Sequence, residues 1–276
     1  MNNVKPAALT IAGSDSGGGA GIQADLRTFN CFNVYGCSVI TAVTAQNPYE
    51  VRRIDVLSPD AVKVQLETVL DAIPVRWAKT GMLANSNIIE RVADVAGRNK
   101  LHLVVDPVMV STSGAKLLED SAVSALQNKL FPLAEWLTPN IPEAELICQS
   151  KLETPGDLID AAADIYRKYK CNVILKSGHA IHSGNAEDVI CHQGEIFLLS
   201  SPSVEISGNT SHGTGCTLSS AITANLASGK TWQEALVTAK AFVYSSLRNS
   251  VSLSSKLKQM YPAGNNCQSQ VVLKGI

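Results

Sequence analysis

Charge of one sign, long apolar runs and paired cysteines are all scarce in this sequence. Lys and Arg total 23 and Asp and Glu total 24, so the net charge at pH 7 is -1. Nucleic acids and anionic membranes are bound through clustered positive charge, and this balanced, scattered charge argues against both partners. The apolar run from Ala7 to Ala12 is too short for a signal peptide or a membrane span. We therefore expect a cytoplasmic protein.

The seven cysteines form no CxxC pair and follow no regular spacing. An odd number of such residues predicts neither a zinc site nor a disulfide framework. Cys37, Cys171 and Cys191 lie in or beside apolar runs, where a free cysteine packs as a small hydrophobic side chain. Cys216 lies in a Gly-rich segment instead.

Short β-branched runs alternate with longer amphipathic stretches along the 276 residues. This alternation is typical of βα units that feed a largely parallel sheet. We expect strands at 8–11, 37–45, 76–80, 102–105, 136–138, 172–176, 186–192 and 195–200. We expect helices at 20–32, from 58 onward, and at 87–96, 117–129, 154–169, 213–228 and 231–249. No linker or repeat interrupts the pattern, so residues 1–276 are expected to form one domain, with a weakly patterned tail from about 252.

A glycine motif near the N-terminus suggests dinucleotide binding, but its context does not support that function. Residues 19–24 (GAGIQA) fit G-x-G-x-x-A after a predicted strand. A dinucleotide fold also requires an acidic residue at the end of the next strand, about 20 positions on, to bind the ribose. That strand ends Ala45-Gln46-Asn47, without an acid. NAD is therefore not an expected cofactor.

Residues 224–231 (ANLASGKT) resemble a loose P-loop, which must follow a strand so that its amides surround a phosphate. The preceding residues 217–226 have a helical pattern instead. We interpret Gly229 as the residue after a helix C-terminus. Thr231 is then the N-cap of the next helix, and Glu234 completes its capping box.

Residues 209–216 (NTSHGTGC) place small residues immediately before a predicted helix. The amides of residues 213–216 would then face an anion, assisted by the helix dipole. An ordinary Gly-rich turn explains the spacing equally well. Cys216 would lie in the first helical turn, where the dipole lowers a thiol pKa. It is therefore a candidate proton acceptor or anion-binding residue, and a packed small side chain is the alternative.

Seven ordered blocks span most of the chain and include the segment around Cys216. They are ALTIAGSDSGGGAGIQAD (8–25), YGCSVITAVTAQ (35–46), KTGML (79–83), VDPVMVSTSG (105–114), TPNIPE (138–143), LKSGH (175–179) and HGTGCTLS (212–219). Together they resemble the hydroxymethylpyrimidine/phosphomethylpyrimidine kinases of thiamin biosynthesis, in the ribokinase superfamily. The resemblance implies a ribokinase-like three-layer α/β/α sandwich around a mostly parallel central sheet.

The resemblance also implies roles at the phosphate end of the site. The amides of Gly213, Thr214, Gly215 and Cys216 would bind the transferring phosphoryl group, with Lys176 near the phosphate chain. Asp106, Asn140 and Glu143 would organise Mg²⁺ and phosphate. Phosphoryl transfer is mostly positioning and electrostatic stabilisation, which suits amides, a cation and metal-binding oxygens. The alternatives are a surface position for Lys176 and loop-shaping roles for Asp106 and Asn140.

For the acceptor ring, the resemblance implies recognition by the backbone at Gly13 and by the side chains of Asp25 and Gln46. The Gln46 amide offers one donor and one acceptor to an aminopyrimidine edge. Met82 and Val108 would contact the ring, although both are equally well explained as core residues. Asp25 could instead be a helix-surface acid. At the position of Cys216 the superfamily usually has an aspartate base, so this thiol either accepts the proton or only aligns the acceptor.

We therefore expect an ATP- and Mg²⁺-dependent kinase of 4-amino-5-hydroxymethyl-2-methylpyrimidine and of its monophosphate, acting as a homodimer. A pyridoxal/pyridoxine kinase and a non-catalytic vitamin-binding module are the alternatives. Two features depart from the family pattern. Thr210 and Ser211 precede His212 where members often have asparagine and threonine, and the tail matches no family pattern.

Overall fold

The computed structural model describes residues 4–109, 118–178, 184–205, 211–262 and 268–276. Its strands are β1 (Ala7–Asp15), β2 (Tyr35–Gln46), β3 (Val51–Val56), β4 (Trp77–Thr80), β5 (His102–Val105), β6 (Ala134–Leu137), β7 (Asn172–Gly178), β8 (Asn185–His192), β9 (Glu195–Pro202), β10 (Val251–Ser254), β11 (Leu257–Gln259) and β12 (Val272–Gly275). Its α-helices are α1 (Gly21–Cys31), α2 (Pro59–Ala72), α3 (Ser86–Arg98), α4 (Asp120–Ala125), α5 (Ile141–Cys148), α6 (Pro155–Tyr169), α7 (Thr214–Ala227) and α8 (Trp232–Arg248).

One sheet has the strand order β12-β9-β8-β7-β6-β5-β4-β1-β2-β3. The neighbours from β7 through β6, β5, β4 and β1 to β2 pair in parallel. The flanking strands β3, β8, β9 and β12 pair antiparallel. Six parallel strands therefore end at one edge of the sheet, which is where ligands bind in open α/β folds. The predicted mostly parallel sheet is confirmed.

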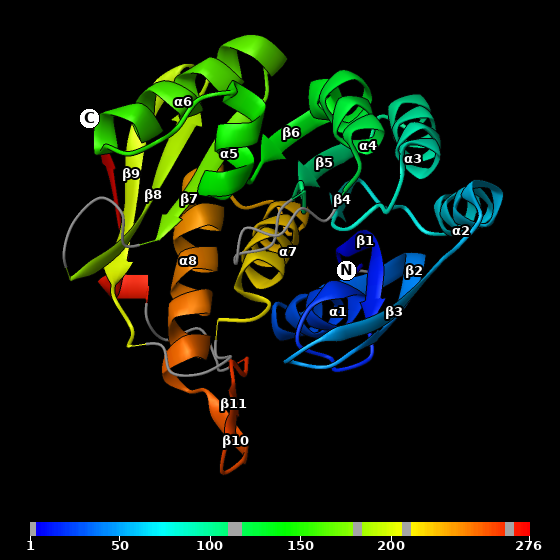
Figure 1. The fold of residues 1–276 in the computed structure, drawn as a ribbon, viewed down its shortest axis with the longest axis horizontal. Coiled ribbons are helices and arrows are strands. Elements are labelled where there is room, and N and C mark those ends of the chain that lie inside the picture. The colour runs from blue at the N-terminus through cyan, green and yellow to red at the C-terminus, as the bar shows by residue number, and fades with distance from the viewer. Residues whose placement is uncertain (1–3, 110–117, 179–183, 206–210, 263–267) are drawn as a thin grey trace.

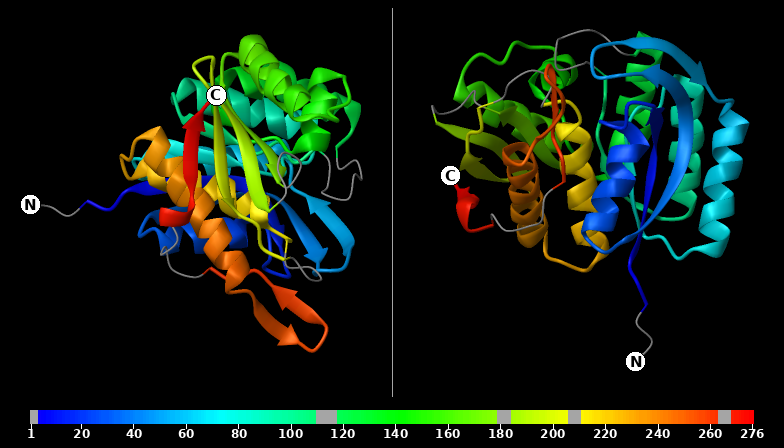
Figure 2. Two further views of the ribbon diagram at one scale, coloured as in Figure 1. Left: turned by 90° about the vertical axis from the view of Figure 1, so that its left-hand side faces the viewer. Right: turned by 90° about the horizontal axis from the view of Figure 1, so that it is seen from below.

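Helices cover both faces of this sheet (Figure 1). Helices α1, α7 and α8 lie on one face, and α2 to α6 lie on the other (Figures 1 and 2). Successive strand residues point to opposite faces, so Val104 of β5 packs in the cluster with Leu218 of α7 and Phe242 of α8. Its neighbour Val105 belongs to the opposite cluster with Ile88 of α3. This is the three-layer α/β/α architecture that the sequence predicted.

The end of α7 and the start of α8 confirm the interpretation of residues 224–231. Gly229 has φ 80° and follows the C-cap Ser228. The Thr231 side chain accepts from the Glu234 amide, and the Glu234 carboxylate accepts from the Thr231 amide. The resemblance to a P-loop is therefore coincidental.

Several elements differ from the sequence prediction. Strand β3 and helix α5 were not predicted, and the helix expected at 117–129 begins at Asp120 and becomes a π-turn at Leu126–Leu130. The tail is more ordered than its pattern suggested, because β12 pairs with β9 and β10 forms a hairpin with β11. That hairpin projects from the body of the molecule (Figure 2). Strand β12 depends on pairing with β9, which is distant in the sequence, whereas β10 and β11 form a local hairpin.

Cys37, Cys171 and Cys191 are buried, as expected of small packing residues. In the described part of the chain, no helix is both long and apolar enough to cross a bilayer. Residues 110–114, His179, Asn209 and Thr210, which belong to motifs quoted above, lie outside the described residues.

Candidate active site

A cavity of about 370 Å³ lies where the parallel strands end and α7 begins. All the predicted site residues line it except Asp25. They are Gly13, Gln46, Met82, Asp106, Val108, Asn140, Glu143, Lys176, Gly213, Thr214, Gly215 and Cys216. The topology therefore brings together residues that are up to 203 positions apart, from Gly13 to Cys216. Their individual roles remain predictions.

Lys176 and Asp106 define one end of this cavity. The Lys176 Nζ lies 2.9 Å from the Asp106 Oδ1, and both side chains are largely buried. A Cβ on Gly215 would lie 3.2 Å from the Lys176 Nζ, so the start of α7 packs closely against the ammonium group. Burial alone would lower the pKa of Lys176, but the Asp106 and Glu143 carboxylates outweigh it and raise the pKa. The lysine therefore stays charged and available to an anion.

Glu143 lies beside this pair and is held by backbone donors. Its carboxylate accepts hydrogen bonds from the Asn140 amide at 2.9 Å, in the capping box of α5, and from the Met109 amide at 3.1 Å. Burial raises its pKa to about 7, and the nearby Asp106 adds to that shift, while Lys176 opposes it. A carboxylate in such a low-dielectric position gains from a bound cation.

The turn before α7 depends on glycine. Gly213 has φ 82°, and a Cβ there would lie 1.9 Å from the Gly19 carbonyl oxygen. No other residue fits this close approach of two loops. The Thr214 amide donates to the Ser211 carbonyl at 3.3 Å, which corrects the prediction that this amide faces the anion. The amides of Gly213, Gly215 and Cys216, at the start of α7, remain candidates for that role.

Cys216 is at the base of the cavity, but its environment differs from the prediction. Burial raises the pKa of the Cys216 thiol. The Lys79 ammonium and the Gly21 amide oppose this effect, while Asp25 and Asp106 reinforce it. The helix dipole was expected to lower the thiol pKa, and desolvation outweighs it. The thiol is therefore protonated at neutral pH.

The other end of the cavity combines apolar side chains with the amide of Gln46. A Cβ on Gly13 would lie 2.7 Å from the Met82 methyl carbon, so the methionine packs directly on the glycine backbone. Val108 has φ 47°, a left-handed conformation that is strained for a β-branched residue. Gln46 ends β2 and presents its side-chain amide beside Thr44. This combination offers a planar ring two apolar contacts and one amide.

Asp25 does not reach the cavity, contrary to the prediction that it binds the ring. Its side chain is fully buried, and its Oδ1 lies 2.7 Å from the Lys79 Nζ. It also accepts hydrogen bonds of 2.6 Å from Thr10 and from Ser220. These contacts join α1, β1, β4 and α7 beneath Cys216. We therefore assign Asp25 a structural role as one partner of a buried ion pair, which the sequence did not predict.

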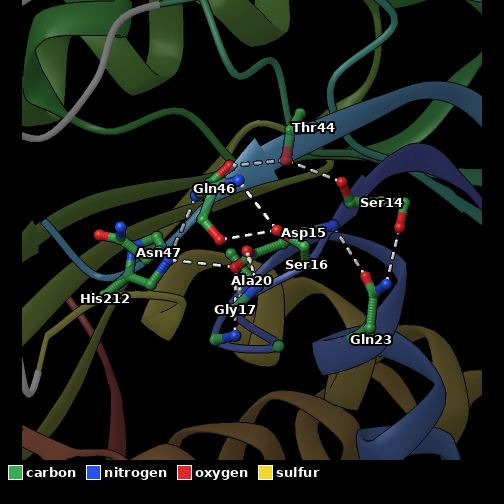
Figure 3. A network of polar contacts seen from close by, with 12 residues as sticks. Ser14, Asp15, Ser16, Gly17, Ala20, Gln23, Thr44, Gln46, Asn47 and His212 are labelled. Carbon is green, nitrogen blue, oxygen red and sulfur yellow. Dashed lines mark hydrogen bonds and ion pairs between the residues drawn. The ribbon is translucent and has the colours of Figure 1, made fainter. Parts of the chain in front are cut away.

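Asp15 and His212, which were given no predicted role, form a polar network at the cavity wall (Figure 3). The Asp15 carboxylate accepts from the amides of Gly17, Gly19 and Ala20, and the His212 Nε2 lies 3.4 Å from its Oδ2. Burial alone would raise the Asp15 pKa, but the histidine and the amides outweigh it and lower the pKa. The position of Asp15 at the end of β1 is a signal that could have identified it from the sequence.

A second cavity of about 280 Å³ adjoins the first. The two share Asn140, Lys176, Ser211, Thr214 and Gly215. The second is lined otherwise by β8, β9 and α8, and includes a buried ion pair, in which the Lys240 Nζ lies 2.7 Å from the Asp188 Oδ2. Lys176 and the start of α7 therefore lie between two compartments. This arrangement suits transfer of an anionic group from one bound molecule to another.

Asp106 and Glu143 are the side chains that fit a Mg²⁺ ion. Among the described residues, no group of three or more His, Cys, Asp and Glu side chains could hold a metal ion. Mg²⁺ usually binds one or two carboxylates and takes its other ligands from phosphates and water. Each Glu143 oxygen accepts a single backbone hydrogen bond from a described residue and keeps a further lone pair. Two carboxylates beside Lys176 therefore match that chemistry.

Comparison with known proteins agrees with this geometry. A family model described as phosphomethylpyrimidine kinase matches residues 15–261. The hydroxymethylpyrimidine/phosphomethylpyrimidine kinase of Haemophilus influenzae is 45% identical over 257 residues, which cover 92% of this chain and 94% of the relative. The crystal structure of phosphomethylpyrimidine kinase from Clostridium difficile 630 is 40% identical, with a TM-score of 0.77, and covers 87% of this chain and 99% of its own.

A further solved structure is that of the pyridoxal kinase from Staphylococcus aureus in complex with AMP-PCP and pyridoxal. It is 32% identical, has a TM-score of 0.85, and covers 99% of this chain and 100% of its own. The family model and the curated relative both cover most of the sequence. The chain therefore belongs to the phosphomethylpyrimidine kinase family.

Proposed function

We propose that this protein transfers the γ-phosphoryl group of ATP to the hydroxymethyl oxygen of 4-amino-5-hydroxymethyl-2-methylpyrimidine, and then to the resulting monophosphate. The observation that carries this proposal is the position of Lys176 and the start of α7 between two adjoining cavities. One cavity offers a planar site with an amide, and the other has room for a nucleotide. Positioning of this kind is the main source of rate in phosphoryl transfer.

In the first cavity, Gln46 would hydrogen-bond the aminopyrimidine edge, and Gly13, Met82 and Val108 would contact the ring faces. The hydroxymethyl group would then point toward Cys216. The raised pKa of this thiol favours alignment of the acceptor over proton abstraction at neutral pH.

At the phosphate end, Lys176 and the Gly215 and Cys216 amides would stabilise charge on the transferring group. Mg²⁺, held by Asp106 and Glu143, would neutralise phosphate charge when bound. The raised pKa of Glu143 supports this assignment, because a cation would stabilise the ionised form that burial disfavours. The nucleotide base would occupy the second cavity near Lys240 and Asp188.

The test is an ADP-release assay with Mg-ATP and each ring in turn. We expect turnover on the hydroxymethylpyrimidine and on its monophosphate. Turnover on pyridoxal alone would refute the proposal and favour the second candidate, a pyridoxal kinase. That alternative is supported by the fold similarity to the Staphylococcus aureus enzyme. Tight ring binding without ADP release would instead identify a non-catalytic binding module.

We also propose that the protein forms a homodimer through the face of β2 and β3. All six residues of β3 are exposed, and it is one of the two edge strands of the sheet. Val51 and Ile54 are each 50% exposed, and Val56, which lies on the same face as Ile54, is 45% exposed. Exposed apolar edges of this kind are usually covered. Ile54→Glu should shift the mass measured by light scattering from dimer to monomer, and a monomeric wild-type protein would contradict the proposal.

A further inference from the structure

The two proposed phosphorylations place different charges in the same cavity. The first acceptor is a neutral alcohol, whereas the second carries a phosphate group with about -1.5 to -2 charge at pH 7. The described residues that line the cavity include three carboxylates, those of Asp15, Asp106 and Glu143. The basic side chains among them are Lys176 and His212, and Lys176 is already paired with Asp106 at 2.9 Å. Because Lys176 is assigned to the transferring group, His212 is the remaining basic side chain among these described residues that could bind a second phosphate.

His212 is held firmly between two loops. Its side chain is 29% exposed, and it directly precedes Gly213 at the start of α7. A Cβ on Gly19 would lie 2.6 Å from the His212 Cδ2, so the ring packs against the backbone of the β1–α1 loop. Within the described part of the chain, both polar contacts of the ring are made by Nε2, to Asp15 and to Gln46. These contacts leave Nδ1 for a ligand.

The surroundings of Nε2 favour a proton on this atom. It lies 3.4 Å from the Asp15 Oδ2, and three backbone amides keep that carboxylate ionised. It also lies 3.5 Å from the amide group of Gln46. The Thr44 hydroxyl has one proton and lies 2.9 Å from the Ser14 carbonyl oxygen and 3.2 Å from the Gln46 side-chain oxygen, so it donates to Ser14. When the Gln46 amide is turned by 180°, its nitrogen donates to the Thr44 oxygen, and its oxygen accepts from the proton on the His212 Nε2.

The groups that face His212 also suit the binding of a phosphate oxygen by its ring. Asp15, from the end of β1, is an anion beside the ring, whereas Gln46 from β2 is neutral. Gln259 of β11 lies beside the same Gly19, and it is neutral as well. An adjacent carboxylate stabilises a positive charge on imidazole. The pair can therefore present a cationic Nδ1–H donor to a phosphate oxygen.

We propose that His212, positioned by Asp15, binds the phosphate group of the monophosphate substrate and thereby determines the efficiency of the second phosphoryl transfer. This inference rests on the proposed function. In the second step an anionic oxygen of the substrate phosphate forms a bond to the γ-phosphorus of ATP. The bond from that phosphorus to the bridging oxygen breaks, and its electron pair leaves with ADP. No proton has to leave the acceptor, so His212 acts by binding and orientation.

The experiment compares wild type, His212→Asn and His212→Gln with each acceptor as the only substrate beside Mg-ATP. We expect kcat/KM for the monophosphate to fall by about 10- to 100-fold, the value of one hydrogen bond to a charged group. Any effect transmitted through the contact between His212 and Gln46 should reach both acceptors, so the decisive quantity is the ratio of kcat/KM for the monophosphate to kcat/KM for the alcohol, which should fall by at least about 10-fold. His102→Asn is the matched control and should affect neither step. His102 is the first residue of β5, so it lies at the opposite end of the parallel strands from the cavity.

The comparison of the two acceptors distinguishes phosphate binding from a general change of cavity shape. Equal losses of kcat/KM on both acceptors, or no loss on either, would each overturn the proposal. A wild-type protein without activity on either acceptor would refute the proposed function instead.

Discussion

Replacing Asp25 by Asn should destabilise the protein severely while leaving the cavity residues in place. The Asp25 carboxylate and the Lys79 ammonium are both fully buried and lie 2.7 Å apart. Without the carboxylate, the lysine charge has no counter-ion within a low-dielectric interior. Removing one partner of a buried pair typically costs about 3–5 kcal/mol. Because whole domains are stabilised by about 5–15 kcal/mol, this single change should remove a large part of the free energy of unfolding.

The assay is urea unfolding followed by circular dichroism, with substrate kinetics on the same samples. The control is Asp94→Asn, which breaks an exposed pair with Arg98 of similar length, 2.8 Å, on α3. Exposed pairs contribute about 0–1 kcal/mol, so burial alone accounts for the expected difference. The double variant Asp25→Asn/Lys79→Met removes both charges and should recover most of the loss.

The result decides between two roles of Asp25. If the carboxylate bound the ring, as the family resemblance implied, Asp25→Asn would raise KM for the pyrimidine and leave stability nearly unchanged. The reasoning from burial would be refuted if Asp25→Asn lowered the free energy of unfolding by less than about 1 kcal/mol. It would also be refuted if Asp25→Asn/Lys79→Met were no more stable than Asp25→Asn.

Three further predictions concern the cavity. Cys216→Ser should lower the rate with the alcohol by less than about 10-fold, because a protonated thiol aligns the acceptor and does not take its proton; a larger loss in initial-rate assays that is confined to the alcohol would show that the thiol acts as a base. Gly213→Ala should abolish turnover and lower the melting temperature, because its Cβ would lie 1.9 Å from the Gly19 carbonyl oxygen; wild-type values of both would contradict the turn geometry. The pKa of Glu143 is raised from 4.5 to about 7. The protonated carboxyl therefore contributes to the free energy of unfolding below pH 4.5, and this contribution is lost as pH rises through about 7. Urea titrations from pH 5 to 8 should show that decline in wild type and not in Glu143→Gln, and parallel profiles would contradict it.

The order of elements and the chemistry of local turns could be predicted because they depend on residues a few positions apart. The capping box of Thr231 and Glu234 spans three residues, and Gly229 ends α7 through its own φ angle. The residues at parallel strand ends were also predictable, since those ends must meet at one edge. Lys176 and Asp106 could for that reason be placed in one cavity from their positions alone.

Burial and contacts between distant segments were decided by the tertiary structure alone. Lys79 is 54 positions from Asp25, and His212 is 197 positions from Asp15, so no local pattern relates either pair. The pKa of Cys216 depends on desolvation, which no sequence window reports, and it opposed the helix dipole that the sequence did predict. The sequence by itself thus determined which chemical groups reach the end of the sheet. Only folding decided which of them face the cavity, which are buried in pairs, and what charge they carry there, because solvent exclusion sets those properties.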